Sequence, residues 1–143
     1  MKQILTFKET ANKCNSPSDI FKAIKKIEID FSQENLLVIF LNTRNKILNA
    51  EIVFKGGVNG SLVDPRTLFR KALLLNAVSL IVAHNHPSGD LSPSLEDTKI
   101  YNQLIRIGEL LTIKVLDSMI FNQKEFYSMN EGGIKNEGIN DTF

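Results

Sequence analysis

The two histidines of the chain are its clearest candidates for chemistry, because they stand two residues apart after an apolar segment. His84 and His86 directly follow residues 80–83, Leu-Ile-Val-Ala, which are typical of a buried strand. In an extended segment, side chains at positions i and i+2 point to the same side, so both imidazoles can face one point. Asn85, between them, can hydrogen-bond the loop or reach a substrate. Since neutral imidazole is a common metal ligand, the pair is a candidate for metal binding.

A hydroxyl and a carboxylate follow at the start of the next predicted helix. Ser94 and Asp97 are three residues apart, which puts them on one helix face. Pro87, Gly89 and Pro93 supply the turns that can fold this helix start back onto the end of the strand. Asp97 is therefore a candidate third ligand, with Ser94 beside it. The alternative is that both residues only cap the helix and interact with its dipole.

Hydrophobic patterning predicts the elements that must position these side chains. The apolar run Leu36–Leu41 indicates a strand buried on both faces, and Ile47–Phe54 indicates a second strand that forms a hairpin with it. The irregular alternation of helices and strands predicts an α/β (α+β) fold, a mixed central sheet flanked by about three helices. Helices are expected near residues 17–28, 64–76 and from Ser92-Pro93 to Leu111, and further strands at Ile4–Phe7, Ala77–Ala83, Ile113–Phe121 and Phe126-Tyr127.

Composition limits the class of protein. The 143 residues suffice for one domain with a core of its own. A net charge of +1 indicates neither a strongly basic surface for nucleic acid nor a polybasic surface for membranes. Cys14 is the single cysteine, which excludes an internal disulfide framework and a cysteine-only zinc site. The longest apolar run has six residues and the N-terminus has no apolar signal region, so we expect a soluble cytoplasmic protein. We expect one domain over residues 1–129, with a short strand and loop in 1–15, and a flexible tail over 130–143.

The motif residues resemble a known family. The string Ala83–Asp90, followed by Pro93-Ser94 and Asp97, is similar to the JAMM signature of the MPN/JAB superfamily of zinc-dependent hydrolases, and to its RadC-like branch in particular. The resemblance runs from about Ser16 to Ser128 and implies a single MPN/JAB-like domain. Many members carry a histidine where this chain has Ser118, a departure that leaves the three metal positions intact.

The resemblance implies a role for each of these residues. A zinc ion would be held by His84, His86 and Asp97, with water in the open position, and Ser94 would help to stabilise an oxyanion. The family also uses an upstream glutamate as general base. Glu34 fits that pattern, since it precedes the buried strand at Leu36, although it could be only a solvated charge. Glu51 is the other candidate, and alternation within its strand leaves open which face it occupies.

Three functions follow from this pattern. The first is a zinc-dependent hydrolase of the metalloprotease type, which cleaves an amide or isopeptide bond in a peptide-type substrate. The second is a DNA-repair-associated, metal-dependent nuclease or accessory protein. Two features count against this second function: the net charge of +1, and the lack of room for the helix-hairpin-helix segment that RadC-like proteins usually carry. We therefore expect no strong autonomous nucleic-acid binding. The third is a non-catalytic binding scaffold, against which the complete ligand set counts. The sequence specifies neither the substrate nor the oligomeric state.

Overall fold

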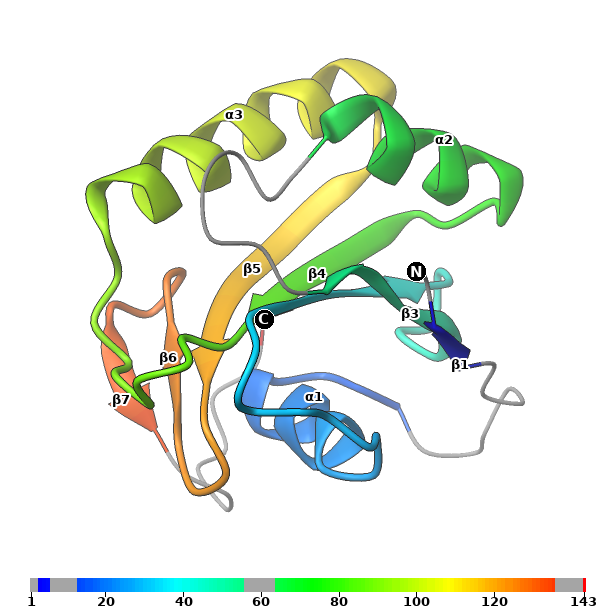
Figure 1. Cartoon of the computed structure of the whole chain (residues 1–143). Coiled ribbons are helices and arrows are strands. Elements are labelled where there is room, and N and C mark those ends of the chain that lie inside the picture. Colours follow the sequence, from blue (N-terminus) through cyan, green and yellow to red (C-terminus); the bar gives the residue numbers. More distant parts are fainter. Residues whose placement is uncertain (1–2, 6–12, 56–63, 136–142) are drawn as a thin grey trace.

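The computed structural model describes residues 3–5, 13–55, 64–135 and 143, and its strands form one mixed sheet. Within these residues, Figure 1 shows α2 and α3 on one face of the sheet and α1 on the other. The α/β fold expected from the sequence, with a central hairpin and three flanking helices, is therefore confirmed. The elements are β1 (Gln3–Leu5), α1 (Pro17–Ile24), β2 (Asn35–Leu41), β3 (Ile47–Lys55), α2 (Pro65–Leu74), β4 (Ser79–His84), α3 (Leu95–Leu111), β5 (Lys114–Phe121), β6 (Phe126–Ser128) and β7 (Gly133–Lys135).

The sheet order is β1-β3-β2-β4-β5-β6-β7, which places β2 and β4 at its centre. Strand β2 pairs antiparallel with β3 and with β4, and Leu36 lies opposite His84. Strand β4 pairs in parallel with β5, so α3 must cross over one face of the sheet to connect them. The start of α3 therefore lies beside the end of β4, where the histidines are.

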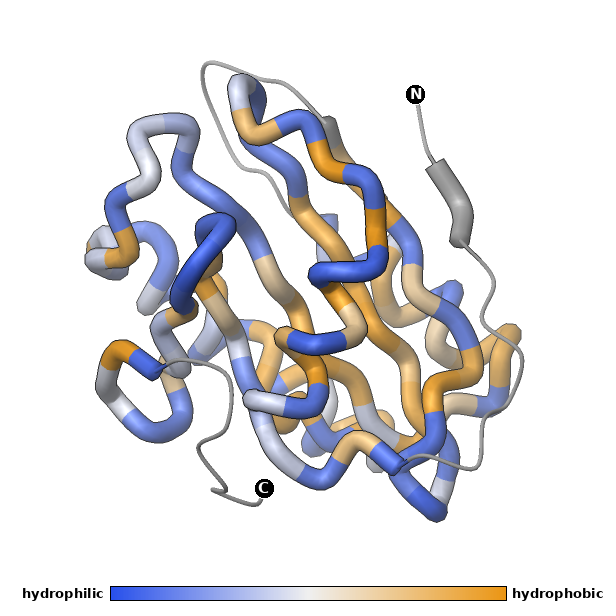
Figure 2. Tube along the Cα trace, turned by 90° about the horizontal axis from the view of Figure 1, so that it is seen from below, coloured by the Kyte–Doolittle hydropathy of each residue, from blue (hydrophilic) through white to orange (hydrophobic). Residues whose placement is uncertain are grey.

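The sheet separates two apolar layers. Every residue of β2 and β4 is buried, and alternate side chains enter opposite layers, as Ile81 packs on the α1 side and Val82 on the side of α2 and α3. Figure 2 shows the apolar strands running through the middle of the molecule and hydrophilic turns at its edges. By this alternation His84 faces the side covered by α3.

Local chemistry sets the helix starts. Ser16 caps α1 and Asp64 caps α2, each directly before a proline in the first helical position. Helix α1 ends at Ile24, four residues before the predicted residue 28, although Ile27 stays buried against the core. Helix α3 begins at Leu95 rather than at Ser92-Pro93, because Ser94 provides its N-cap.

The prediction of a flexible tail from residue 130 is wrong for residues 133–135. These residues form β7, which pairs antiparallel with β6 and extends the sheet. A three-residue edge strand with one large apolar side chain, Ile134, leaves too weak a pattern for sequence analysis. The predicted strand Ile4–Phe7 is observed as Gln3–Leu5, and residues 6 and 7 lie outside the described residues.

No helix among the described residues is long and apolar enough to cross a membrane.

Candidate metal centre

The two histidines present their rings to the same region at the end of β4. His84 is the last residue of the strand and His86 follows in the loop, with ring centroids 5.1 Å apart. The His84 side chain is 7% exposed and that of His86 is 20% exposed, so both rings are largely withdrawn from water. The i and i+2 spacing therefore brings the imidazoles together as the extended backbone requires.

Asp97 joins the histidines from the first turn of α3. Its Oδ1 lies 3.1 Å from Nε2 of His84, and its Oδ2 lies 3.4 Å from Nε2 of His86. The same carboxylate accepts a hydrogen bond from the backbone N–H of Ser94 at 2.8 Å, while Ser94 Oγ accepts one from the backbone N–H of Asp97 at 3.0 Å. Helix capping and proximity to the histidines thus coexist in one residue.

Asp97 lies at a ligand-like distance from each ring, through a different carboxylate oxygen in each case. Nitrogen and oxygen ligands about 2.0–2.1 Å from a tetrahedral zinc ion are about 3.3 Å from one another. The two nitrogen–oxygen distances to Asp97, 3.1 and 3.4 Å, match that separation. Moreover, Nε2 of His84 is buried and makes no hydrogen bond among the described residues, although it lies 3.1 Å from Oδ1 of Asp97. A buried nitrogen without a partner is what an ion at this point would satisfy.

Asp97 and the ring of His86 shift each other's pKa values. Burial alone would raise the pKa of the Asp97 carboxyl, but its contacts with His84 and His86 hold that pKa far below its usual range. The contact with Asp97 in turn raises the pKa of the His86 imidazole, against the effect of burial. Asp97 is therefore an anion in the folded protein, the state a metal ligand requires.

A backbone hydrogen bond orients the ring of His86. Its Nδ1 lies 2.8 Å from the carbonyl oxygen of Asp90, and a carbonyl can only accept, so Nδ1 must donate. In the neutral ring the bare nitrogen is then Nε2, which faces Asp97. Asn122 fixes the same loop by donating from Nδ2 to the carbonyl of Gly89 at 3.1 Å. This arrangement is typical of metal-binding histidines, whose second nitrogen is commonly held by a carbonyl or carboxylate.

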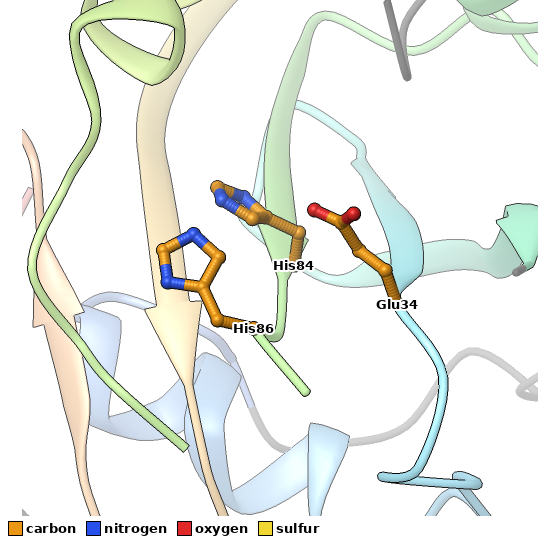
Figure 3. Close-up of side chains that lie close together, drawn as sticks. All are labelled: Glu34, His84 and His86. Carbon is orange, nitrogen blue, oxygen red and sulfur yellow. The ribbon is translucent and has the colours of Figure 1, made fainter. Parts of the chain in front are cut away.

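Glu34 approaches the histidines from a different part of the chain. Figure 3 shows its carboxylate pointing toward His84 from the segment that leads into β2. One carboxylate oxygen of Glu34 and one nitrogen of each histidine all lie within 4.8 Å of one another, a group that could hold a metal ion. The pairing of Leu36 with His84 explains the approach, because it brings the start of β2 beside the end of β4.

Glu51, the alternative glutamate, has a different partner. Its side chain is 3% exposed and lies 2.7 Å from Nζ of Lys71 on α2. Glu51 pairs with Val38, which lies two residues further along β2 from Leu36, the residue beside His84. The structure thus brings Glu34, and not Glu51, together with the histidines.

Three asparagines that support the site carried little signal in the sequence. Asn85 and Asn35 hydrogen-bond each other, and Asn122 holds the loop after His86. Their contacts span 33 to 52 residues of sequence, and only the strand register could have revealed them.

Comparison with known proteins identifies the family. A family model described as RadC-like JAB domain matches residues 14–134. The chain belongs to the RadC-like JAB domain family. This match covers every residue of the candidate metal centre, from Glu34 to Asp97.

Curated relatives of this RadC-like domain are bacterial proteins. The chain is 41% identical over 118 residues to a UPF0758 protein of Halalkalibacterium halodurans, which covers 82% of the chain and 51% of that protein. A UPF0758 protein of Clostridium perfringens is 41% identical over 125 residues, covering 87% and 55% respectively. One from Clostridium botulinum is 40% identical over 134 residues, covering 92% and 58%. The RadC-like domain therefore spans little more than half the length of these relatives.

Proposed function

We propose that this RadC-like domain is a zinc-dependent hydrolase of amide or isopeptide bonds. The observation that carries the proposal is the convergence of His84, His86 and Asp97, with a carboxylate oxygen of Glu34 within 4.8 Å of a nitrogen of each histidine. Two imidazoles and one carboxylate suit zinc, and three protein ligands leave a fourth position open, as in catalytic sites. A bound zinc ion would supply a polarising charge and a water whose pKa is about 7.

The protein side chains divide the remaining work. His84, His86 and Asp97 would hold the ion. Glu34, whose carboxylate lies near both histidines, would take a proton and pass it to the leaving amine. Ser94 uses its oxygen as a cap acceptor, so its O–H proton is free to donate toward an oxyanion.

Metal content tests the first half of the proposal. The purified protein, reconstituted with zinc at neutral pH, should hold about one ion per chain, measured by elemental analysis after gel filtration. The variants His84→Ala and His86→Ala should lose most of it, because each removes one of three ligands. Retention of one zinc ion by both variants, or none in the wild type, would contradict the assignment.

The variant Glu34→Gln tests the second half. It preserves shape but removes the base, so zinc occupancy should stay unchanged while hydrolysis of a peptide or isopeptide library falls by about 10²–10⁴. Glu51→Gln is the matched control, a glutamate on the same sheet bonded to Lys71, and should retain both zinc and hydrolysis. If Glu34→Gln instead loses the ion, the glutamate is a ligand rather than a proton carrier.

The same preparation separates the two other functions. A DNA-repair nuclease or accessory protein would bind DNA with an affinity that falls steeply with salt, which a net charge of +1 does not favour. A non-catalytic scaffold would bind peptides equally well with and without the metal. Fluorescence anisotropy with labelled DNA, and with peptides before and after chelation, distinguishes these outcomes from hydrolysis.

A further inference from the structure

The side-chain amide of Asn85 holds the chain on both sides of Glu34. Asn85 is fully buried and lies between the two histidines. Its Oδ1 accepts a hydrogen bond from the backbone N–H of Asn35 at 2.8 Å, and its Nδ2 donates one to the backbone carbonyl of Gln33 at 2.8 Å. Glu34 is therefore bracketed by one carboxamide, in the way that a neighbouring strand would bracket it.

Asn35 reinforces this connection from the other strand. Its Nδ2 donates to Oδ1 of Asn85 at 3.1 Å and also lies within hydrogen-bond distance of the carbonyls of Gln33 and Asp30, at 3.0 and 2.9 Å. The backbone N–H of Asn85 donates to the carbonyl of Asn35 at 3.4 Å. The regular pairing of β2 with β4 ends at Leu36 and His84, and these amides continue the connection beyond it, to Asn35 and Gln33.

We propose that Asn85 is a positioning residue that fixes the Glu34 carboxylate relative to the metal ligands. The inference rests on the proposed function, in which Glu34 carries protons at the site of His84 and His86. A carboxamide is required because one group must accept from Asn35 and donate to Gln33, which neither a carboxylate nor a methyl group can do. Since the backbone of Asn85 links the two histidines directly, this one residue connects the segment of the proposed base to the proposed metal ligands.

The expected effect follows from the sensitivity of catalysis to geometry. A displacement of about 1 Å in a reacting group can lower a rate about 10²-fold. Replacing Asn85 by Ala would release the Gln33 carbonyl and the Asn35 N–H while leaving His84, His86 and Asp97 unchanged. The loss should therefore appear at Glu34 and leave metal content intact.

A mutant cycle on the cobalt-loaded protein tests the proposal without a substrate. Wild type, Asn85→Ala, Glu34→Gln and the double variant are loaded with Co²⁺, and their visible absorption spectra are compared. We expect each single variant to alter the ligand-field bands, and Asn85→Ala to add nothing in the Glu34→Gln background. A merely structural role would produce the same change in both backgrounds, or none, and would overturn the proposal.

Amide hydrogen exchange on the metal-free protein provides a second measurement. The N–H of Asn35 should exchange at least about 10-fold faster in Asn85→Ala than in the wild type, whereas the amides of β5 should not change. The variant Ile20→Val, a core change in α1, controls for general loss of stability and should leave Asn35 protected. Unchanged exchange at Asn35 in Asn85→Ala would overturn the proposal.

The two measurements separate failure of this inference from failure of the proposed function. If the wild type takes up no Co²⁺, the zinc hydrolase proposal fails, and exchange at Asn35 alone decides whether Asn85 fixes the Glu34 segment. If cobalt binds and Glu34→Gln alters the spectrum while Asn85→Ala does not, the function stands and the positioning role is wrong.

Discussion

Ser94 combines a structural and a chemical capacity in one hydroxyl. Its oxygen accepts the backbone N–H of Asp97, which makes it the N-cap of α3. The variant Ser94→Ala should therefore lose about 1 kcal/mol of unfolding free energy. If the O–H also donates to an oxyanion, kcat should fall by about 10²–10³ with KM and zinc content little changed. Urea denaturation and steady-state kinetics on the same preparation measure both effects.

The conservative variant Ser94→Thr is the control for this prediction. Threonine retains a hydroxyl that can cap the helix and donate, so it should stay close to the wild type in both measurements. Full activity in Ser94→Ala, together with the loss of stability, would show that the residue only caps.

Residue-level chemistry was the part of the site most accessible from sequence. His84, His86, Ser94 and Asp97 lie within 14 residues, so local rules for strands and helix starts were enough to group them. The pairing of Glu51 with Lys71 could not be derived, because it depends on which face of β3 the glutamate occupies and on how α2 packs over it. The family pattern, rather than local geometry, favoured Glu34.

At the scale of elements, the end of α3 packs against the start of β5 with no room for a side chain at Gly108. A Cβ atom added there would lie 2.2 Å from the backbone carbonyl oxygen of Ile113. The backbone N–H of Ile113 in turn donates a hydrogen bond to the carbonyl oxygen of Gly108. The variant Gly108→Ala should lower the unfolding free energy by about 1–3 kcal/mol, since the backbone must shift. Thermal denaturation followed by circular dichroism measures this change.

The variant Glu109→Ala is the matched control for Gly108→Ala. It lies next to Gly108 on the exposed side of α3 and should change stability by less than about 0.5 kcal/mol. Equal stability of Gly108→Ala and the wild type would mean that the helix end can move away from Ile113 without loss.

Asp117 in β5 predicts a pH dependence of stability. This buried carboxylate accepts hydrogen bonds from Ser128 Oγ at 2.5 Å and from the backbone N–H of Asn130 at 2.9 Å. Burial nevertheless raises its pKa from 3.8 to about 6. The folded state thus holds this proton more tightly, so the contribution is fully present below about pH 3.8 and is lost as pH rises through 6, a change on the order of 3 kcal/mol.

Urea denaturation between pH 4 and pH 7.5 tests this dependence. The variant Asp117→Asn has no proton to release, so the difference in unfolding free energy between it and the wild type should change across this range, in the direction that penalises the wild type at higher pH. A difference that stays constant with pH would show that Asp117 does not titrate there.

Hydrophobic patterning predicts the central elements better than it predicts where a helix ends or where a short edge strand lies. The periodicity that included Ile27 extended α1 too far, because a side chain can stay buried after the helix itself has ended at Ile24. The central strands were predicted well, since continuous burial of β2 and β4 leaves an unbroken apolar run. The edge strand β7 has no such run.

At the scale of the whole molecule, two apolar layers and not the metal should hold the fold. Removal of the ion by a chelator should leave the far-ultraviolet circular dichroism spectrum unchanged and lower the melting temperature by a few degrees, as expected for loss of a bound ligand. Titration with ethylenediaminetetraacetate followed by a thermal scan measures both. Collapse of the secondary structure on chelation would show that the ion is a structural requirement.

The pairing of β2 with β4 also has a consequence for the order of folding. The histidines and Asp97 are separated by at most 13 residues, whereas Glu34 meets His84 across 50 residues of chain. Closing the longer loop costs about 1 kcal/mol more in chain entropy. A nascent or refolding chain should therefore assemble the strand–helix segment around His84 first and gain its glutamate only when the centre of the sheet closes, so, under the proposed function, a partly folded chain would hold metal ligands before it has its base.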